Sequence, residues 1–216
     1  MGGQQIMDSL RWFEIGISID LDNLQNYVNT LEQTLVQQKK SFEEMVDRQA
    51  AEIEEEYRDE FYEYHSDEHW QLSDVFPSTL RSSVFVASYS MFEHHLVDVC
   101  KREYKRQKLA KVPNFRNRVI FSAKEYLEND AKIKLPNKMP AWDMICVYNK
   151  LRNTIIHENG KLNERIKEEL KGYLSKSSAV TLDQYDILHF TEEFCLEVIK
   201  NMKEFFFKEL LPAIPD

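Results

Sequence analysis

Hydrophobic residues recur at intervals of three and four along most of the chain, which is the spacing of an amphipathic helix. The first such stripe lies in a stretch from about Ser9 to His69, which we expect to form one or two long helices. Its clearest members are Leu21, Leu24, Val28, Leu31 and Leu35. From Phe42 to Trp70 the apolar residues are spread thinly among acidic ones, which favours a hairpin arm with a narrow apolar seam.

Later stripes predict further helices. Pro77 interrupts the pattern, and Ser78 then has the character of a helix N-cap. Asn159 and Gly160 supply a helix stop signal, since Gly160 can adopt the left-handed conformation. The chain has only 5 glycines and 6 prolines in 216 residues, too few for a turn-rich β fold, so we expect an all-α protein. The expected later helices are 78–107, 115–127, 141–158, 162–174 and 183–211.

Charge divides the chain unevenly, although its net charge is only −9. Residues 43–74 contain 13 acidic and 2 basic residues, a net charge of −11. Residues 101–124 contain 9 basic residues and 1 acidic residue, a net charge of +8. We therefore expect an acidic N-terminal arm or hairpin over residues 1–74 and a helical bundle over residues 75–216.

Several classes of function find no support in the sequence. The cysteines Cys100, Cys146 and Cys195 are widely spaced, which indicates reduced thiols rather than a zinc site or a disulfide framework. His65 and His69 are four residues apart, but no third ligand accompanies them, so we expect no metal and no cofactor. The N-terminus does not resemble a signal peptide, and no apolar run is long enough for a membrane span. We therefore expect a cytoplasmic protein without a membrane partner.

The helix expected over residues 141–158 carries the candidate site. Asn149, Asn153 and His157 are each four residues apart, so they share one side of the helix. Arg152 is suited to holding a phosphate, and His157 at the helix end is suited to acid–base chemistry. Arg152 and His157 lie about 140° apart around the helix, so a site that uses both needs either a reaching Arg152 or a second chain. On spacing alone there is a structural alternative to a functional site, in which these side chains cap helix carbonyls and pair with acidic residues.

The segment from Leu151 to Gly160 (LRNTIIHENG) resembles the signature of the HEPN superfamily, in which an arginine and a polar residue precede a histidine at a helix end. The segment from Phe85 to Leu96 is similar to the family's first core helix, with an aromatic residue and Glu93 before the leucine. The resemblance covers roughly residues 78–210 and leaves the acidic arm unexplained.

The resemblance implies a HEPN-like helical bundle that forms a homodimer, with two Arg–His motifs meeting in the dimer cleft. It further implies a metal-independent endoribonuclease of a toxin–antitoxin or phage-defence system, with RNA as substrate and an antitoxin or other defence protein as a possible partner. By the same resemblance Arg152 would hold the scissile phosphate and His157 would move protons during attack by the ribose 2′-hydroxyl. Asn153 would orient the phosphate or His157, and Glu93 would be the acidic residue of the neighbouring helix.

The basic stretch of residues 101–124 allows two interpretations, and the sequence does not decide between them. It could guide an RNA backbone, or it could only balance the acidic arm, on which it would dock within the chain or across a dimer. The candidate RNA-binding residues are Lys101, Arg102, Lys105, Arg106, Arg116 and Arg118. For the whole chain, the alternatives to a ribonuclease are a non-catalytic HEPN module that binds RNA or a protein, and a structural helical bundle with a chance motif.

Overall fold

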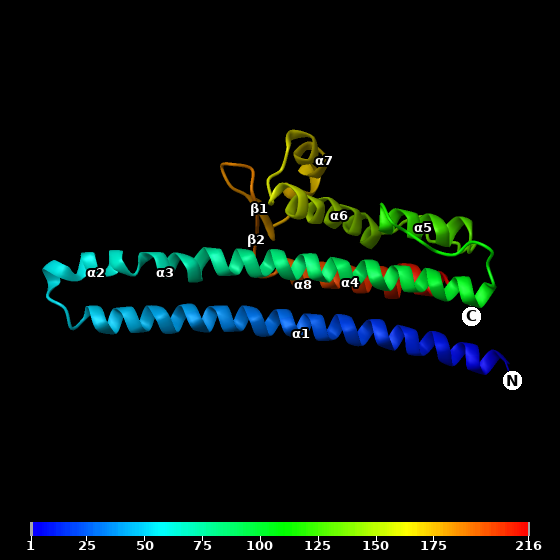
Figure 1. Cartoon of the computed structure of the whole chain (residues 1–216), viewed down its shortest axis with the longest axis horizontal. Coiled ribbons are helices and arrows are strands. Elements are labelled where there is room, and N and C mark those ends of the chain that lie inside the picture. The colour runs from blue at the N-terminus through cyan, green and yellow to red at the C-terminus, as the bar shows by residue number, and fades with distance from the viewer. Residues whose placement is uncertain (1, 216) are drawn as a thin grey trace.

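The structure is built on a long helical hairpin. The computed structural model describes the backbone of residues 2–215 and the side chains of residues 11–215. One leg is the helix α1, and the other leg returns alongside it through short helical segments into α4 (Figure 1). The elements of the hairpin are α1 (Gly2–Ala50), η1 (Glu55–Tyr57), α2 (Arg58–Tyr64), α3 (Ser66–Trp70), η2 (Gln71–Val75) and α4 (Phe76–Gln107).

The remaining elements cover one side of this hairpin. The helices α6 and α8 both pack on α4, and α8 also packs on α1. Figure 1 shows α5 and α6 following α4, with α7 and the two strands beyond the end of α6. The elements are α5 (Val119–Asn129), α6 (Pro140–Glu158), α7 (Glu164–Leu174), β1 (Val180–Leu182), β2 (Leu188–Phe190), α8 (Phe194–Glu204), η3 (Phe205–Leu210) and η4 (Leu211–Ala213).

The helix α1 belongs to two parts of the molecule. Ile17, Leu21 and Val28 are fully buried in the same core cluster as residues of α4 and α8. The first half of α1 therefore completes the bundle, and the core crosses the boundary expected at residue 74. Residues 36–75, which we call the hairpin arm, contribute no side chain to this core cluster, and the arm extends beyond the bundle (Figure 1). Buried side chains of the arm lie on α1, whereas η1, α2, α3 and η2 bury none.

The return leg passes into α4 without the break expected at Pro77. The π-helical turn η2 runs directly into α4, and Pro77 occupies the first turn, where its missing N–H is tolerated. The expected N-cap at Ser78 was wrong, because Ser78 lies inside the helix and α4 starts without a side-chain cap. The expected end was right: α4 ends at Gln107, and Lys108 follows in the left-handed conformation.

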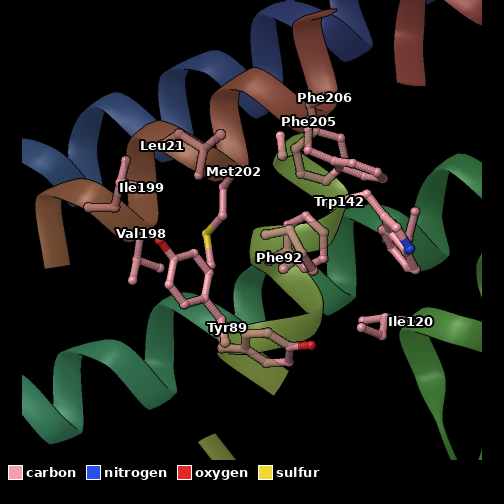
Figure 2. Close-up of a cluster of buried hydrophobic side chains, with 14 of the residues drawn as sticks. Leu21, Tyr89, Phe92, Ile120, Trp142, Val198, Ile199, Met202, Phe205 and Phe206 are labelled. Carbon is pink, nitrogen blue, oxygen red and sulfur yellow. The ribbon is translucent and has the colours of Figure 1, made fainter. Parts of the chain in front are cut away.

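Aromatic side chains from several elements form the centre of the bundle. Figure 2 shows Leu21 of α1, Phe92 of α4, Trp142 of α6 and Phe206 of η3 around the same core. The Phe92 and Phe206 ring centroids lie 5.2 Å apart, within the range of favourable aromatic pairs. The site helix α6 is thus held between α4 and the C-terminal helix by large, well-packed side chains.

A buried ion pair fixes the hairpin against the bundle. The Nε and Nη2 atoms of Arg81 on α4 donate to the two carboxylate oxygens of Glu32 on α1, both at 2.8 Å. Its Nη1 donates to the Phe190 carbonyl of β2 at 3.0 Å. The two side chains are only 18% and 12% exposed, so this two-pronged pair sets the position of α1 along α4.

A distant carboxylate caps the start of α6. The backbone amides of Ala141 and Trp142 donate to the two oxygens of Glu209, at 2.8 and 3.0 Å. Glu209 is buried in η3, far away in the sequence. Two amides that the first turn leaves unpaired are therefore satisfied by a residue of the last helical segment.

The C-terminal third contains strands where one helix was expected over residues 183–211. Val180–Leu182 and Leu188–Phe190 pair as antiparallel strands, and the helix begins only at Phe194. The Asp183 side chain accepts from the Tyr185 and Ile187 amides, which closes the turn between the strands. The fold is otherwise helical, as expected.

The other helix limits follow local signals to different degrees. The helix α6 agrees with the expected range of 141–158, and Asn159 and Gly160 end it with positive φ. The helix α7 starts at Glu164 because the Asn163 side chain accepts from the Ile166 amide. The helix α5 begins at Val119, four residues later than expected. Within residues 2–215, no helix has both the length and the hydropathy that crossing a bilayer requires.

Replacing Glu209 should destabilise the fold, because it leaves two buried amides of α6 without an acceptor. We expect Glu209→Ala to lower the free energy of unfolding by about 2 kcal/mol, measured by urea denaturation. Glu204→Ala is the matched control, since Glu204 only pairs with the exposed Lys208 and should change stability by less than about 0.5 kcal/mol. Equal stability of the two variants would contradict the capping role.

Candidate functional site

The second half of α6 presents polar side chains to α4. Leu151 and Thr154 are buried in the bundle, whereas Arg152 and Asn153 are partly exposed. Asn149 lies one turn before Asn153 on the same side of the helix, as the spacing predicts. The facing turn of α4 carries Tyr89, whose ring is fully buried.

A chain of hydrogen bonds joins these residues. The Asn149 Nδ2 donates to the Tyr89 hydroxyl at 2.9 Å, and the Asn153 Nδ2 donates to the Asn149 Oδ1 at 3.3 Å. The Arg152 Nη1 then donates to the Asn153 Oδ1 at 3.0 Å. The side-chain amides therefore hold the Arg152 guanidinium in place over α4, and we call Tyr89, Glu93, Asn149, Arg152 and Asn153 the polar cluster.

Glu93 brings a carboxylate to the polar cluster. It follows Tyr89 by one turn of α4 and is partly buried. Burial raises the pKa of the Glu93 carboxyl above its ordinary value, and the positive charge of Arg152 partly offsets this effect. Burial also raises the pKa of the Tyr89 hydroxyl far above its ordinary value, so this group stays neutral.

One donor of Arg152 has no acceptor. Its Nε–H is buried and finds no hydrogen-bond partner among the described residues. Leaving such a group unpaired costs about 1–3 kcal/mol, so an unpaired donor on a charged side chain needs a reason. An oxyanion ligand would supply one, because a guanidinium binds phosphate or carboxylate oxygens through paired N–H groups.

His157 lies apart from the polar cluster. It is exposed in the last turn of α6, and within the described part of the chain its ring forms no hydrogen bond or ion pair. The backbone after it is well held, since the Leu188 amide donates to the Gly160 carbonyl at 3.0 Å. The structure thus brings Arg152, Asn153 and Glu93 together, and it leaves His157 facing solvent on the same helix.

The candidate RNA-binding residues of α4 and of the segment that follows it differ in their surroundings. Arg102 and Arg106 are engaged inside the protein by the fully buried Glu103, to which the Arg106 Nη2 donates at 2.6 Å. Lys101 pairs with Asp98 at 2.8 Å. Lys105, Arg116 and Arg118 are exposed, and the Arg118 guanidinium lies over the Phe121 ring. Arg102 and Arg106 therefore have a structural role, whereas Lys105, Arg116 and Arg118 are accessible to a ligand.

Tyr89 is the residue that sequence reasoning missed. Its hydroxyl is the acceptor that anchors the amide chain, whereas the sequence indicates only that Tyr89 lies on a core helix. The signal was present, because Tyr89 precedes Glu93 by four residues and so shares its side of α4. A tyrosine with an apolar ring and a polar tip is well suited to such an edge of the core.

Other reactive groups are poorly placed for chemistry. Burial raises the pKa of the thiols of Cys100 and Cys195 to about 12 and that of Cys146 to about 11, which keeps them protonated. Among the described residues, no group of three or more His, Cys, Asp or Glu side chains is arranged to hold a metal ion. His69 contacts Glu43 instead, at 3.2 Å.

Comparison with known proteins adds no family or relative. No family model matches the chain, and no curated protein or solved structure matches it. Function is therefore inferred from the chemistry of the polar cluster and of the helix that carries it.

Substituting Glu93 should change stability in a pH-dependent way. Its raised pKa means that the folded state binds a proton more tightly than the unfolded state, so the ionised carboxylate destabilises the fold above that pKa. We expect Glu93→Gln to raise the free energy of unfolding at pH 7. The gain should shrink as the pH falls through the raised pKa and vanish below 4.5, the ordinary pKa of a glutamate carboxyl.

Chemical denaturation between pH 3.5 and 8 measures this difference. Glu125→Gln on α5 is the control, because Glu125 is exposed and has no contact partner in the described residues. A gain for Glu93→Gln that is independent of pH would contradict the assignment.

Proposed function

We propose that this protein is a metal-independent endoribonuclease of the HEPN type, with a role as a toxin or in phage defence. The observation that carries the proposal is the Arg152 guanidinium, held by Asn153 with a buried Nε–H that lacks an acceptor. A donor prepared in this way matches a phosphate oxygen. The resemblance of residues 151–160 to the HEPN signature supplies the reaction class.

The proposed cleavage reaction starts from an RNA phosphate bound at Arg152. Arg152 binds the scissile phosphate and stabilises the charge that develops on its oxygens. The ribose 2′-oxygen attacks the phosphorus while the bond to the 5′-oxygen breaks, which gives a 2′,3′-cyclic phosphate and a 5′-hydroxyl. One proton leaves the 2′-hydroxyl and one reaches the 5′-oxygen, and His157 is the group assigned to these transfers. Asn153 is a positioning residue, because it acts through Arg152.

A second copy of α6 would complete the site. His157 and Arg152 leave the helix about 140° apart, and His157 has no contact with the polar cluster in its own chain. In a homodimer that pairs these helices, the histidine of one protomer could reach the phosphate held by the other. This arrangement uses the exposed position of His157.

Cleavage of total RNA in the presence of EDTA tests the proposal. Arg152→Ala and His157→Ala should each reduce the cleavage rate by about 100-fold or more, since each removes a group that acts in the transition state. The matched controls are Arg165→Ala and His94→Ala, whose side chains are 81% and 76% exposed. Cleavage that requires a divalent metal, or that survives both substitutions, would contradict the mechanism.

One observation favours a second candidate, a non-catalytic HEPN module that binds RNA. The polar cluster is complete without His157, so phosphate binding needs only Arg152 and its supporting amides. For this function, fluorescence anisotropy with a labelled RNA should show weaker binding by Arg152→Ala and unchanged binding by His157→Ala, with no cleavage by either. Binding lost in both variants would argue against the module.

A further inference from the structure

The two strongly charged parts of the molecule lie at opposite ends. The acidic residues 43–74 occupy the hairpin arm, and the C-terminal end of α4 lies at the other end of the molecule (Figure 1). Residues 98–138, which we call the basic end, contain 12 basic and 5 acidic residues, a net charge of +7. Residues 76–97 of the continuous helix α4 lie between them and span about 33 Å, so the arm cannot fold onto the basic end of its own chain.

The arm exposes apolar as well as acidic side chains. Large hydrophobic residues that a monomer would leave in water line it from one end to the other. These exposed residues are Val36, Tyr57, Tyr62, Tyr64 and Trp70. Because the return leg of the arm buries none of its own residues, its apolar surface is available to a partner.

The arm also carries a groove of mixed character. Phe42 and Val46 of α1 form part of its floor, with Tyr62 and His65 from the return leg, and its volume is about 510 Å³. Glu43 and Asp47 lie in the same groove. Apolar walls beside carboxylates suit the alkyl stem and charged head of a lysine or arginine.

The basic end offers the complementary groups. Lys105, Lys108 and Arg116 are exposed and have no carboxylate partner among the described residues. The exposed side chains of Trp12 and Ile15 lie at the same end, because the neighbouring Phe13 ring contacts Arg102 of α4. Unpaired cations beside exposed apolar residues therefore match what the arm presents.

We propose that the hairpin arm of one protomer docks on the basic end of a second, antiparallel copy of this chain. In a dimer with two-fold symmetry this contact occurs twice, once at each end of the dimer, so both arms and both basic ends are covered. Opposite charge sets the orientation, and the exposed aromatic residues supply apolar contact. The arm's own negative charge would repel RNA, so a nucleic acid is not its partner.

The position of the axis follows from the helix geometry. The groove lies near residue 65 and the exposed lysines near residue 105, so the midpoint of the return leg and α4 is close to residue 85. That is about one turn from Tyr89. The dimer does not depend on RNA cleavage, yet it would place the polar clusters of two protomers on either side of one axis.

Sedimentation equilibrium of the full chain tests the docking. Raising the salt concentration from 0.1 M to 1 M shortens the screening length from about 10 Å to about 3 Å, so the dimer dissociation constant should rise at least tenfold. A protein that is monomeric at both salt concentrations, or a dimer whose dissociation constant does not change with salt, would overturn the proposal.

Charge reversal identifies the surfaces. Glu63→Lys/Asp67→Lys in the arm and Lys105→Glu/Arg116→Glu in the basic end should each weaken the dimer by about tenfold or more. An equal mixture of the two variants should restore it, because in the mixed dimer each arm faces an oppositely charged basic end. The control Glu164→Lys/Glu168→Lys changes the same number of exposed acids on α7 and should leave dimerisation unchanged.

Three results would count against the docking. Dimers that survive both reversals are formed by another surface. A mixture that stays monomeric shows that the reversed charges do not face each other. If Lys105→Glu/Arg116→Glu loses binding to a labelled RNA while remaining as dimeric as the unmodified protein, the basic end is a nucleic-acid surface instead. Circular dichroism checks that every variant keeps the helical fold.

Discussion

The ion pair between Glu32 and Arg81 is the constraint on which the arrangement depends. A two-pronged pair allows one register of α1 on α4, and the third bond of Arg81, to the Phe190 carbonyl, adds the strands to the same point. On one side of this point α1 faces α8 and becomes core, and on the other side it faces the return leg and becomes the arm. A buried pair of this kind adds little net stability, and its main effect is to specify one alignment of two long helices.

Parts of the fold determined by neighbouring residues could be predicted from the sequence, and parts determined by distant ones could not. The limits of α6 and the end of α4 follow from apolar spacing and from residues that accept a left-handed backbone, such as Asn159. The cap of α6 comes from Glu209, and no local pattern identifies it. The strands were missed because each is only three residues long and its partner lies across a turn. The division of α1 between bundle and arm depends likewise on what packs against it.

The candidate site shows the same division. The Arg152–Asn153 hydrogen bond lies on the side of α6 that faces α4, where Glu93 also lies, although the sequence predicted only that Asn153 would orient the phosphate or His157. Tyr89 was missed, since a tyrosine in an aromatic core helix gives no sign that its hydroxyl will be an acceptor. Spacing did indicate that His157 and Arg152 diverge, and the structure leaves His157 in solvent. The basic stretch was misleading in part, because Arg102 and Arg106 serve the buried Glu103.

The return leg of the arm buries none of its residues, and this affects how freely the length of the arm can change. Among the described residues of the arm, the buried hydrophobic side chains are Phe42, Val46 and Ala50 of α1, and none of them belongs to the bundle core, so both legs could gain or lose turns while the bundle stays unchanged. Two turns added to each leg would extend its reach by about 11 Å and keep the same faces together. The length of the arm is therefore not constrained by the packing of the bundle core, and a change in that length would alter the dimensions of an assembly without altering the polar cluster.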